Sequence, residues 1–241
     1  CRILLVDQTA NDLSISGGLA SKQSFEQMLQ DALAENDSEI IIKTHPDVLS
    51  GKKQGYLVDH DLPKNVRLIA EDCNPVNLIA QVDEVWCVTS QMGFEACMAR
   101  KKVRCYGMPF YAGWGITEDQ IKQERRVEKR SLEEIFAAAY LLYSTYFDPD
   151  TVGICELEVV IEHIARQRHY WQQNQGDFIC LGFDTWKHTH VRDYLRSDDN
   201  RILFRQRLSN EDVKNQPRIL VWGNNADRAS IELANRHGLA V

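Results

Sequence analysis

Short apolar runs alternate with helical patterns along the first 145 residues of this chain. The runs are rich in Ile, Leu and Val, show no regular polar alternation, and cover residues 2–6, 39–43, 66–70, 84–89 and 103–106. Runs of this kind are typical of strands that are covered on both faces, as in parallel sheets. Between the first two runs, apolar residues at helical spacing predict a helix with one buried face: Phe25, Met28, Leu29, Ala32 and Leu33. The alternation predicts an α/β fold of right-handed βαβ units with a doubly wound parallel sheet.

A second α/β pattern begins near residue 177. It comprises expected strands at 178–181, 202–204 and 219–222, and expected helices at 186–196 and 226–237. A helical pattern over 156–173 precedes it and ends in the polar run Gln-Gln-Asn-Gln-Gly, which is the best linker candidate. We therefore expect a complete lobe at residues 1–150, a helical linker at 151–176 and a truncated second lobe at 177–241.

Composition excludes several classes of protein. Of the 241 residues, 44% are hydrophobic and 26% are charged, so the chain is neither collagen-like nor wholly disordered. No run approaches the ~20 apolar residues of a membrane-spanning helix. The net charge of −7 argues against a general nucleic-acid binder, because phosphate backbones require a positive surface. The mixed-charge run at 122–130 is expected to be a solvated loop.

Cysteine usage points to free thiols. The chain has seven cysteines, an odd number, and no CxxC pair. This pattern is typical of buried thiols in a reducing cytoplasm, and the clustered spacing of a zinc site is absent.

Three polar segments follow predicted strands of the first lobe, at residues 7–18, 43–47 and 89–95. The carboxyl ends of parallel strands lie at one edge of a sheet, where open α/β folds bind their ligands. We therefore expect the three segments to meet at one rim. No metal motif accompanies them, so no metal is expected at this site.

The third segment has the chemistry of an anion site. Ser90 and Gln91 stand at a predicted helix start, where unpaired amides and the positive end of the helix dipole favour a phosphate. Glu95, expected in the first turn and stabilised there by the dipole, could accept hydrogen bonds from ribose hydroxyls. An ordinary helix cap explains the same residues without a ligand.

His45 and Asp12 each allow a functional and a structural interpretation. His45 precedes Pro46, which keeps it in an extended segment where its ring could donate to a phosphoryl oxygen; a plain turn residue is the alternative. Asp12 is either a turn-capping residue or a carboxylate nucleophile beside a cleft. A carboxylate, a histidine and a phosphate-binding helix start at one rim are together typical of a nucleotide-sugar site.

Four motifs occur in order along the first lobe. They are Val6-Asp7-Gln8-Thr9-x-Asn11-Asp12-x-Ser14, Lys43-x-His45-Pro46-Asp47-Val48-Leu49-x-Gly51-Lys52-Lys53-x-Gly55-Tyr56, Val88-Thr89-Ser90-Gln91-x-Gly93-Phe94-Glu95-Ala96 and Gly107-Met108-Pro109-Phe110-Tyr111-Ala112-Gly113-Trp114-Gly115. Together they resemble the KpsC-type capsule polysaccharide proteins, which are bacterial β-Kdo glycosyltransferases with two tandem modules. Two later segments resemble the opening of the next module: Leu181-Gly182-Phe183-x-x-Trp186-Lys187 and Val221-Trp222-Gly223.

The resemblance implies a GT-B architecture, with two Rossmann-like lobes in each module and the donor bound mainly by the carboxyl-terminal lobe. Residues 1–150 would then be the donor lobe of the first module, and residues 177–241 the start of the amino-terminal lobe of the second. The resemblance further implies CMP-β-Kdo as donor, no other cofactor, retention of anomeric configuration, and an acceptor that carries Kdo on a lysophosphatidylglycerol anchor. It implies a cytoplasmic protein, peripheral at the inner face of the inner membrane, with other capsule export proteins as partners.

The resemblance also assigns roles to residues. The Asp of the Asn-Asp-x-Ser motif, here Asp12, would be the nucleophile of a double displacement. By analogy with CMP-sugar transferases, His45 and Ser90 would hold the CMP phosphate, and Glu95 would lie near the ribose. The full set of expected substrate-binding residues is Gln8, His45, Lys52, Ser90, Gln91 and Glu95.

One family feature is missing, because the acidic Glu-Asp-Gly-Phe segment of the amino-terminal lobe does not occur in this sequence. No motif supplies the acid/base that activates the acceptor. The chain also opens on Cys1 within a strand pattern and closes at a strand start, so we expect an internal fragment of a transferase that is inactive alone. The alternatives are a CDP-polyol phosphotransferase or nucleotide-sugar epimerase of similar fold, or a noncatalytic scaffold of a capsule export assembly.

Overall fold

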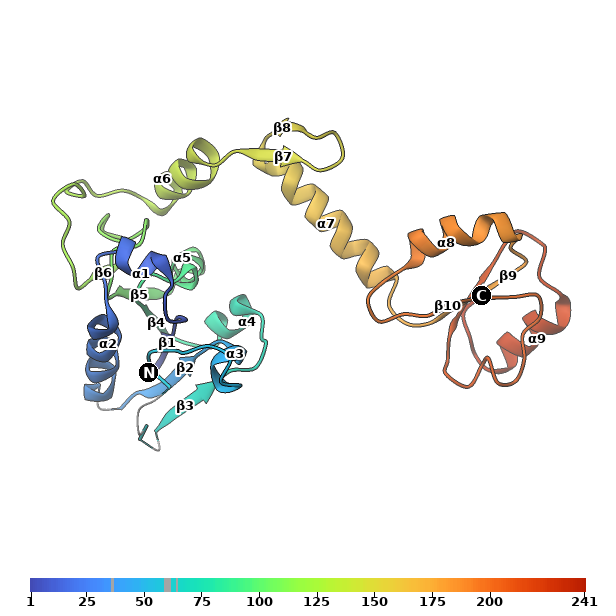
Figure 1. Ribbon diagram of the computed structural model, residues 1–241, viewed down its shortest axis with the longest axis horizontal. Helices are drawn as coiled ribbons and strands as arrows, with labels where there is room; N and C mark the ends of the chain where they lie inside the picture. Colours follow the sequence, from blue (N-terminus) through green and yellow to red (C-terminus); the bar gives the residue numbers. More distant parts are fainter. Residues whose placement is uncertain (36, 59–61, 64) are drawn as a thin grey trace. The chain divides into compact units, whose positions relative to one another are not determined.

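A six-stranded parallel sheet forms the centre of the first unit (Figure 1). Its strand order is β3-β2-β1-β4-β5-β6, and every neighbouring pair is parallel. The strands are β1 (Arg2–Val6), β2 (Glu39–Lys43), β3 (Val66–Ile69), β4 (Glu84–Cys87), β5 (Lys102–Cys105) and β6 (Glu118–Asp119). The five predicted strands are confirmed, with small shifts in their ends.

The computed structural model describes residues 1–35, 37–58, 62–63 and 65–241. The chain divides after Ser144 into two units, Cys1–Ser144 and Thr145–Val241. The division precedes the predicted boundary at residue 150, and the helix predicted to be a linker belongs to the second unit.

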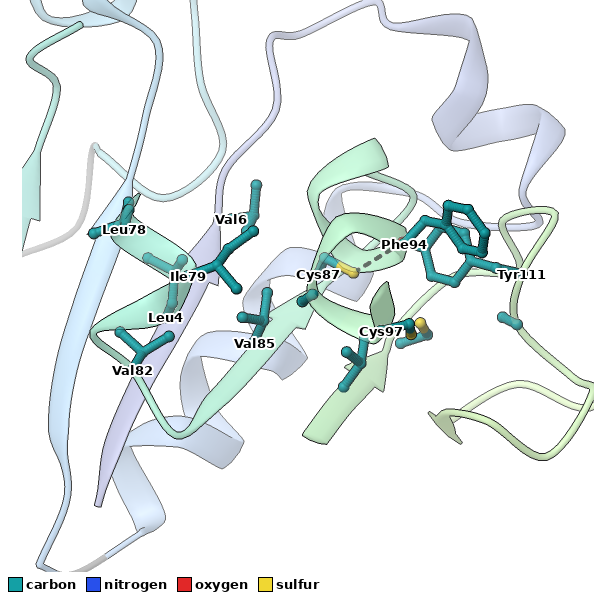
Figure 2. Packing of buried hydrophobic residues seen from close by; sticks show 14 of the residues in the cluster. Leu4, Val6, Leu78, Ile79, Val82, Val85, Cys87, Phe94, Cys97 and Tyr111 are labelled. Carbon is teal, nitrogen blue, oxygen red and sulfur yellow. Dashed lines mark hydrogen bonds between the residues drawn. The ribbon is translucent and has the colours of Figure 1, made fainter. Parts of the chain in front are cut away.

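Side chains of β1 point alternately to the two faces of the sheet, so each face has its own core. On one face, Leu4 shares a buried cluster with residues of α4 (Pro75–Ala80) and α5 (Gln91–Met98), among them Phe94 (Figure 2). On the other face, Leu5 shares a cluster with Phe25 of α2 (Lys22–Ala34). Helices therefore cover both faces, which confirms the prediction of a doubly wound α/β fold.

The order of the strands places the polar segments. From β1 the chain passes to β2 and β3 on one side, and then returns to β4 on the other side of β1. The carboxyl ends of β1 and β4 therefore form a switch point of the kind at which open α/β sheets bind ligands. The three polar segments at residues 7–18, 43–47 and 89–95 follow β1, β2 and β4.

The remaining elements of the first unit are α1 (Leu13–Gly17), α3 (Pro46–Leu49), α6 (Leu132–Phe136) and the π-helical η1 (Ala137–Tyr143). Ser131 and Glu134 form a capping box that opens α6. After Phe136 the backbone widens from α-helical into π-helical turns.

The second unit contains a parallel three-stranded sheet in the order β10-β9-β11. Its elements are the antiparallel pair β7 (Tyr146–Asp148) and β8 (Gly153–Cys155), then α7 (Leu157–Gln173), β9 (Phe178–Leu181), the 3₁₀-helix η2 (Thr185–Lys187), α8 (His188–Leu195), β10 (Ile202–Arg205), β11 (Arg218–Val221) and α9 (Arg228–Arg236). The predicted α/β pattern of this region is confirmed. Within the part of the chain that the structure describes, no helix combines the length and apolarity needed to cross a bilayer.

Candidate functional site

A cavity of about 730 Å³ lies at the carboxyl ends of β1, β2 and β4. Five of the predicted site residues line it together: Gln8, Asp12, His45, Ser90 and Gln91. The three polar segments thus meet at one rim, as the sheet topology requires. In the described ranges, no group of three or more His, Cys, Asp or Glu side chains is arranged to hold a metal ion.

Gln8 joins the loop after β1 to the loop after β4. Its Oε1 accepts a hydrogen bond from the Thr89 amide at 2.9 Å, and its Nε2 donates to Thr89 Oγ1 at 3.0 Å and to Asp12 Oδ2 at 3.1 Å. Ser14 Oγ lies 3.0 Å from Thr89 Oγ1 and extends the same network. Because the Thr89 amide requires an acceptor, the orientation of the Gln8 amide is set and its Nε2 is left to donate to Asp12.

Asp12 caps α1, since its Oδ1 accepts the Ser14 amide at 2.9 Å. Burial acts to raise the pKa of Asp12, but hydrogen bonds from Ser14 and Gln8 outweigh it and hold the pKa below the usual value of aspartate. Asp12 is therefore a carboxylate at neutral pH. The capping interpretation is confirmed, and the same half-buried side chain lines the cavity.

His45 and Ser90 also cap helices, and each has a second polar group that can donate a hydrogen bond to a ligand. His45 caps α3, where its Nδ1 accepts the Asp47 amide at 3.1 Å. With Nδ1 as acceptor, the neutral ring carries its proton on Nε2, which can donate. Ser90 caps α5, where its Oγ accepts the Met92 amide at 3.3 Å, so the hydroxyl proton is directed elsewhere.

Two of the predicted substrate contacts do not line this cavity. Glu95 is the fifth residue of α5, because Ser90 is the cap and the helix begins at Gln91. It therefore lies beyond the first turn, and the prediction that the helix dipole stabilises it there is wrong. Burial raises the pKa of Glu95, and its Oε2 has no hydrogen-bond partner among the described residues. Lys52 is exposed in the turn that follows α3.

The role of Asp7 was not recognised in the sequence, although the residue directly follows a buried strand. Asp7 is buried and accepts hydrogen bonds from Thr44 Oγ1 at 2.9 Å and from the Tyr56 amide at 3.0 Å. A Cβ on Gly55 would lie 2.4 Å from Asp7 Oδ2, so only glycine fits beside it. Burial raises the pKa of Asp7 although these hydrogen bonds oppose the shift. Asp7 thereby fastens the segments after β1 and β2 to each other.

Arg126 also lines the cavity, although it belongs to the run predicted to be a solvated loop. Its Nη1 donates to the carbonyl oxygens of Pro109 at 2.5 Å and of Ala112 at 2.7 Å. Met108, Pro109 and Phe110 of this loop line the cavity, and the guanidinium thus fixes the loop in the cavity wall. No sequence spacing signals this contact, because it joins two loops through tertiary structure.

Comparisons with known proteins identify several relatives of this chain. The capsule polysaccharide modification protein LipA of Neisseria meningitidis serogroup B is 40% identical over 245 residues, which cover 98% of this chain and 35% of LipA. Two solved structures from Thermosulfurimonas dismutans are also similar. KpsC, beta Kdo 2,4 transferase, matches with a TM-score of 0.64 and 48% identity over 68% of this chain and 51% of that chain. KpsC, beta Kdo 2,7 transferase, matches with a TM-score of 0.57 and 32% identity over 69% of this chain and 54% of that chain.

The chain therefore spans about a third of the length of LipA and about half of each matched KpsC chain. The family model for capsule polysaccharide biosynthesis proteins matches residues 2–149, which is more than half of the chain and contains the whole cavity. This chain belongs to the family of capsule polysaccharide biosynthesis proteins.

Proposed function

We propose that residues 1–150 form the donor lobe of a glycosyltransferase that moves Kdo from CMP-β-Kdo to a glycolipid-anchored Kdo linker during capsule polysaccharide biosynthesis. The observation that carries this proposal is the shared cavity, in which the ionised Asp12 lies with His45 and Ser90. The similarity to two Kdo transferases supports the choice of sugar. The proposal implies a cytoplasmic protein that works at the inner face of the inner membrane.

In the first step, the Asp12 carboxylate attacks the anomeric carbon of Kdo. A bond forms between a carboxylate oxygen and this carbon, while the bond from the carbon to the phosphate oxygen breaks and CMP leaves with the electron pair. The His45 Nε2–H and the Ser90 hydroxyl donate to the phosphate, whose negative charge grows as it leaves. The start of α5 adds the positive end of its dipole at the same position.

In the second step, an acceptor hydroxyl attacks the anomeric carbon and displaces Asp12, while its proton passes to a base. Two displacements at one carbon restore its configuration, so the reaction retains the anomer. Gln8 donates to Asp12 Oδ2 and stabilises the free carboxylate before the first step and after the second. Since the chain spans 35% of LipA, we expect the isolated chain to bind the nucleotide without completing transfer.

Mass spectrometry of the full-length protein after incubation with CMP-Kdo tests the nucleophile. We expect one Kdo adduct on the peptide that contains Asp12, and no adduct in Asp12→Ala. Asp37→Ala is the matched control, because Asp37 is exposed just before β2, at the amino end of the strands. An adduct on a different peptide, or full transfer by Asp12→Ala, would remove Asp12 from this role.

A panel of donors separates the proposal from its alternatives. CMP and CMP-Kdo should raise the melting temperature of the protein more than CDP-glycerol or UDP-sugars at equal concentration. A larger shift with CDP-glycerol would favour a polyol phosphotransferase, and a larger shift with UDP-sugars an epimerase. No shift with any nucleotide would favour a scaffold.

A further inference from the structure

A second cavity, of about 860 Å³, adjoins the first and takes no part in the steps described above. Its walls come from the loop around residues 110–114, from α6 and from η1. They are mostly aromatic or aliphatic and include Phe110, Trp114, Ile135, Ala139, Tyr140 and Tyr143. Arg130 and Glu134 are its charged lining residues.

The two cavities share a wall. We call the first, with Asp12 and Ser90, the polar cavity and the second the apolar cavity. Phe110 lines both, and the Nε2 of Gln91 in the polar cavity donates to the Oη of Tyr140 in the apolar cavity. Tyr140 stacks on Phe136 with 4.9 Å between ring centroids and on Phe94 with 5.8 Å. A molecule bound in the polar cavity therefore has the apolar cavity directly beside it, across a wall of packed aromatic rings.

Exposed apolar side chains and positive charge accompany the apolar cavity. Tyr143, in its lining, is 89% exposed, and the neighbouring Leu142 is 84% exposed. The Arg130 side chain is 49% exposed and lies 3.7 Å from Glu134, a weak pair in water that leaves the guanidinium open to an anion. The run that ends at Arg130 holds five basic and two acidic residues between 122 and 130.

We propose that the apolar cavity binds the acyl chain of the glycolipid acceptor, with an anionic group at the head of that chain on Arg130. This inference rests on the proposed function and adds the place of the lipid. An alkyl chain needs no hydrogen bonds, whereas a peptide would bury its amides against walls with few polar partners. Because Phe110 lines both cavities, a chain held in the apolar cavity has its head on the side of Asp12 and Ser90.

Titration of the 241-residue chain with alkyl phosphates of about 8, 10 and 12 carbons, each below its critical micelle concentration, tests the inference. Each buried methylene should lower Kd about fourfold. A bromine atom at the chain end should quench Trp114, so quenching should be lost in Trp114→Phe. It should persist in the matched variant Trp222→Phe, because Trp222 does not line the cavity.

Ala138→Phe fills the cavity and should weaken binding about tenfold. Ala34→Phe, at an exposed position of α2, should leave it unchanged. A Kd that does not depend on chain length, or quenching that persists in Trp114→Phe, would overturn the inference. Self-association of the chain that Ala138→Phe abolishes would overturn it as well, because a second copy would then be the occupant.

CMP binding, measured by thermal shift on the same samples, separates this inference from the proposed function. If CMP binds and the alkyl phosphates do not, only the lipid site is rejected. If the alkyl phosphates bind with the expected dependence on length and CMP does not, the proposed function is rejected.

Discussion

Replacing Gln8 by Leu should loosen the loops that form the polar cavity. Leucine has about the shape of glutamine but can neither accept from the Thr89 amide nor donate to Asp12 Oδ2. The Thr89 amide then loses its partner at the rim. Asp12 keeps its bond from the Ser14 amide, so α1 remains capped while the link between the loops after β1 and β4 is lost.

The expected loss of stability follows from these contacts. An ordinary hydrogen bond contributes about 1 kcal/mol, a bond to a charged group about 1.5–3 kcal/mol, and an unpaired buried amide costs about 1–3 kcal/mol. Water in the cavity can solvate Asp12, which removes part of that cost. A total of about 2–4 kcal/mol results, or roughly 6–12 °C in the melting temperature of a unit of this size.

Calorimetry of the chain measures this shift, with Gln30→Leu as the control. Gln30 is exposed on α2, and surface substitutions of this kind change stability by less than about 0.5 kcal/mol. If Gln8→Leu melts within about 2 °C of Gln30→Leu, the Gln8 network does not hold the two loops together. The same variant should also raise the pKa of Asp12 toward the usual value, because one of the bonds that lower it is gone.

Three further predictions follow from single contacts. Gly55→Ala should lower the melting temperature of the first unit, because the added Cβ would lie 2.4 Å from Asp7 Oδ2, whereas Gly17→Ala meets nothing; equal melting of the two variants in calorimetry would contradict this. Because the pKa of Asp12 is lowered, its carboxylate stabilises the fold above the unfolded pKa of about 3.9 and loses that contribution as the pH falls through the folded pKa. Asp12 should therefore stay ionised between about pH 8 and pH 5, and its protonation should not reduce the yield of the Kdo adduct in the full-length protein over that range. A loss of adduct in mass spectra with a midpoint above pH 5 would contradict the lowered pKa of Asp12. Four of the seven cysteines are buried, so a thiol reagent should label the native chain at the other three and leave these four until unfolding; fast labelling of more than three would refute the packing. Burial also raises the pKa of Cys97 to about 12 and of Cys180 to about 11, which slows their reaction further. The four protected cysteines are Cys87, Cys97, Cys105 and Cys180.

Much of the fold was predictable because the sequence carries it locally. The Ile, Leu and Val runs specify buried parallel strands, and right-handed crossovers then bring the carboxyl ends of β1, β2 and β4 to one edge. That step alone predicts that Asp12, His45 and Ser90 lie close together. Their roles as helix caps were predictable because these contacts are local: each side chain accepts a hydrogen bond from the amide two residues further along the chain.

The contacts that were missed are tertiary. Arg126 reaches the carbonyl oxygens of Pro109 and Ala112 across two loops, and nothing in a charged run distinguishes it from its solvated neighbours. Glu95 is not in the first turn, because a helix that begins at Gln91 makes it the fifth helical residue. The residues of η1 have the composition of an ordinary α-helix, so the sequence does not signal its π-helical turns. The hydrogen bond from Gln91 to Tyr140 joins residues that are far apart in the sequence.

The lowered pKa of Asp12 separates two reactions that such a cavity could serve. A phosphotransferase directs an acceptor hydroxyl at phosphorus and needs a base for its proton, and a base works best when its pKa lies near the working pH. Hydrogen bonds from Ser14 and Gln8 make Asp12 a weaker base than an ordinary aspartate. The same bonds keep it ionised and oriented, which is what attack on a sugar carbon requires. Gln8→Leu should therefore slow adduct formation in the full-length protein even though it makes Asp12 more basic, and a faster adduct in this variant would indicate that Asp12 acts as a base.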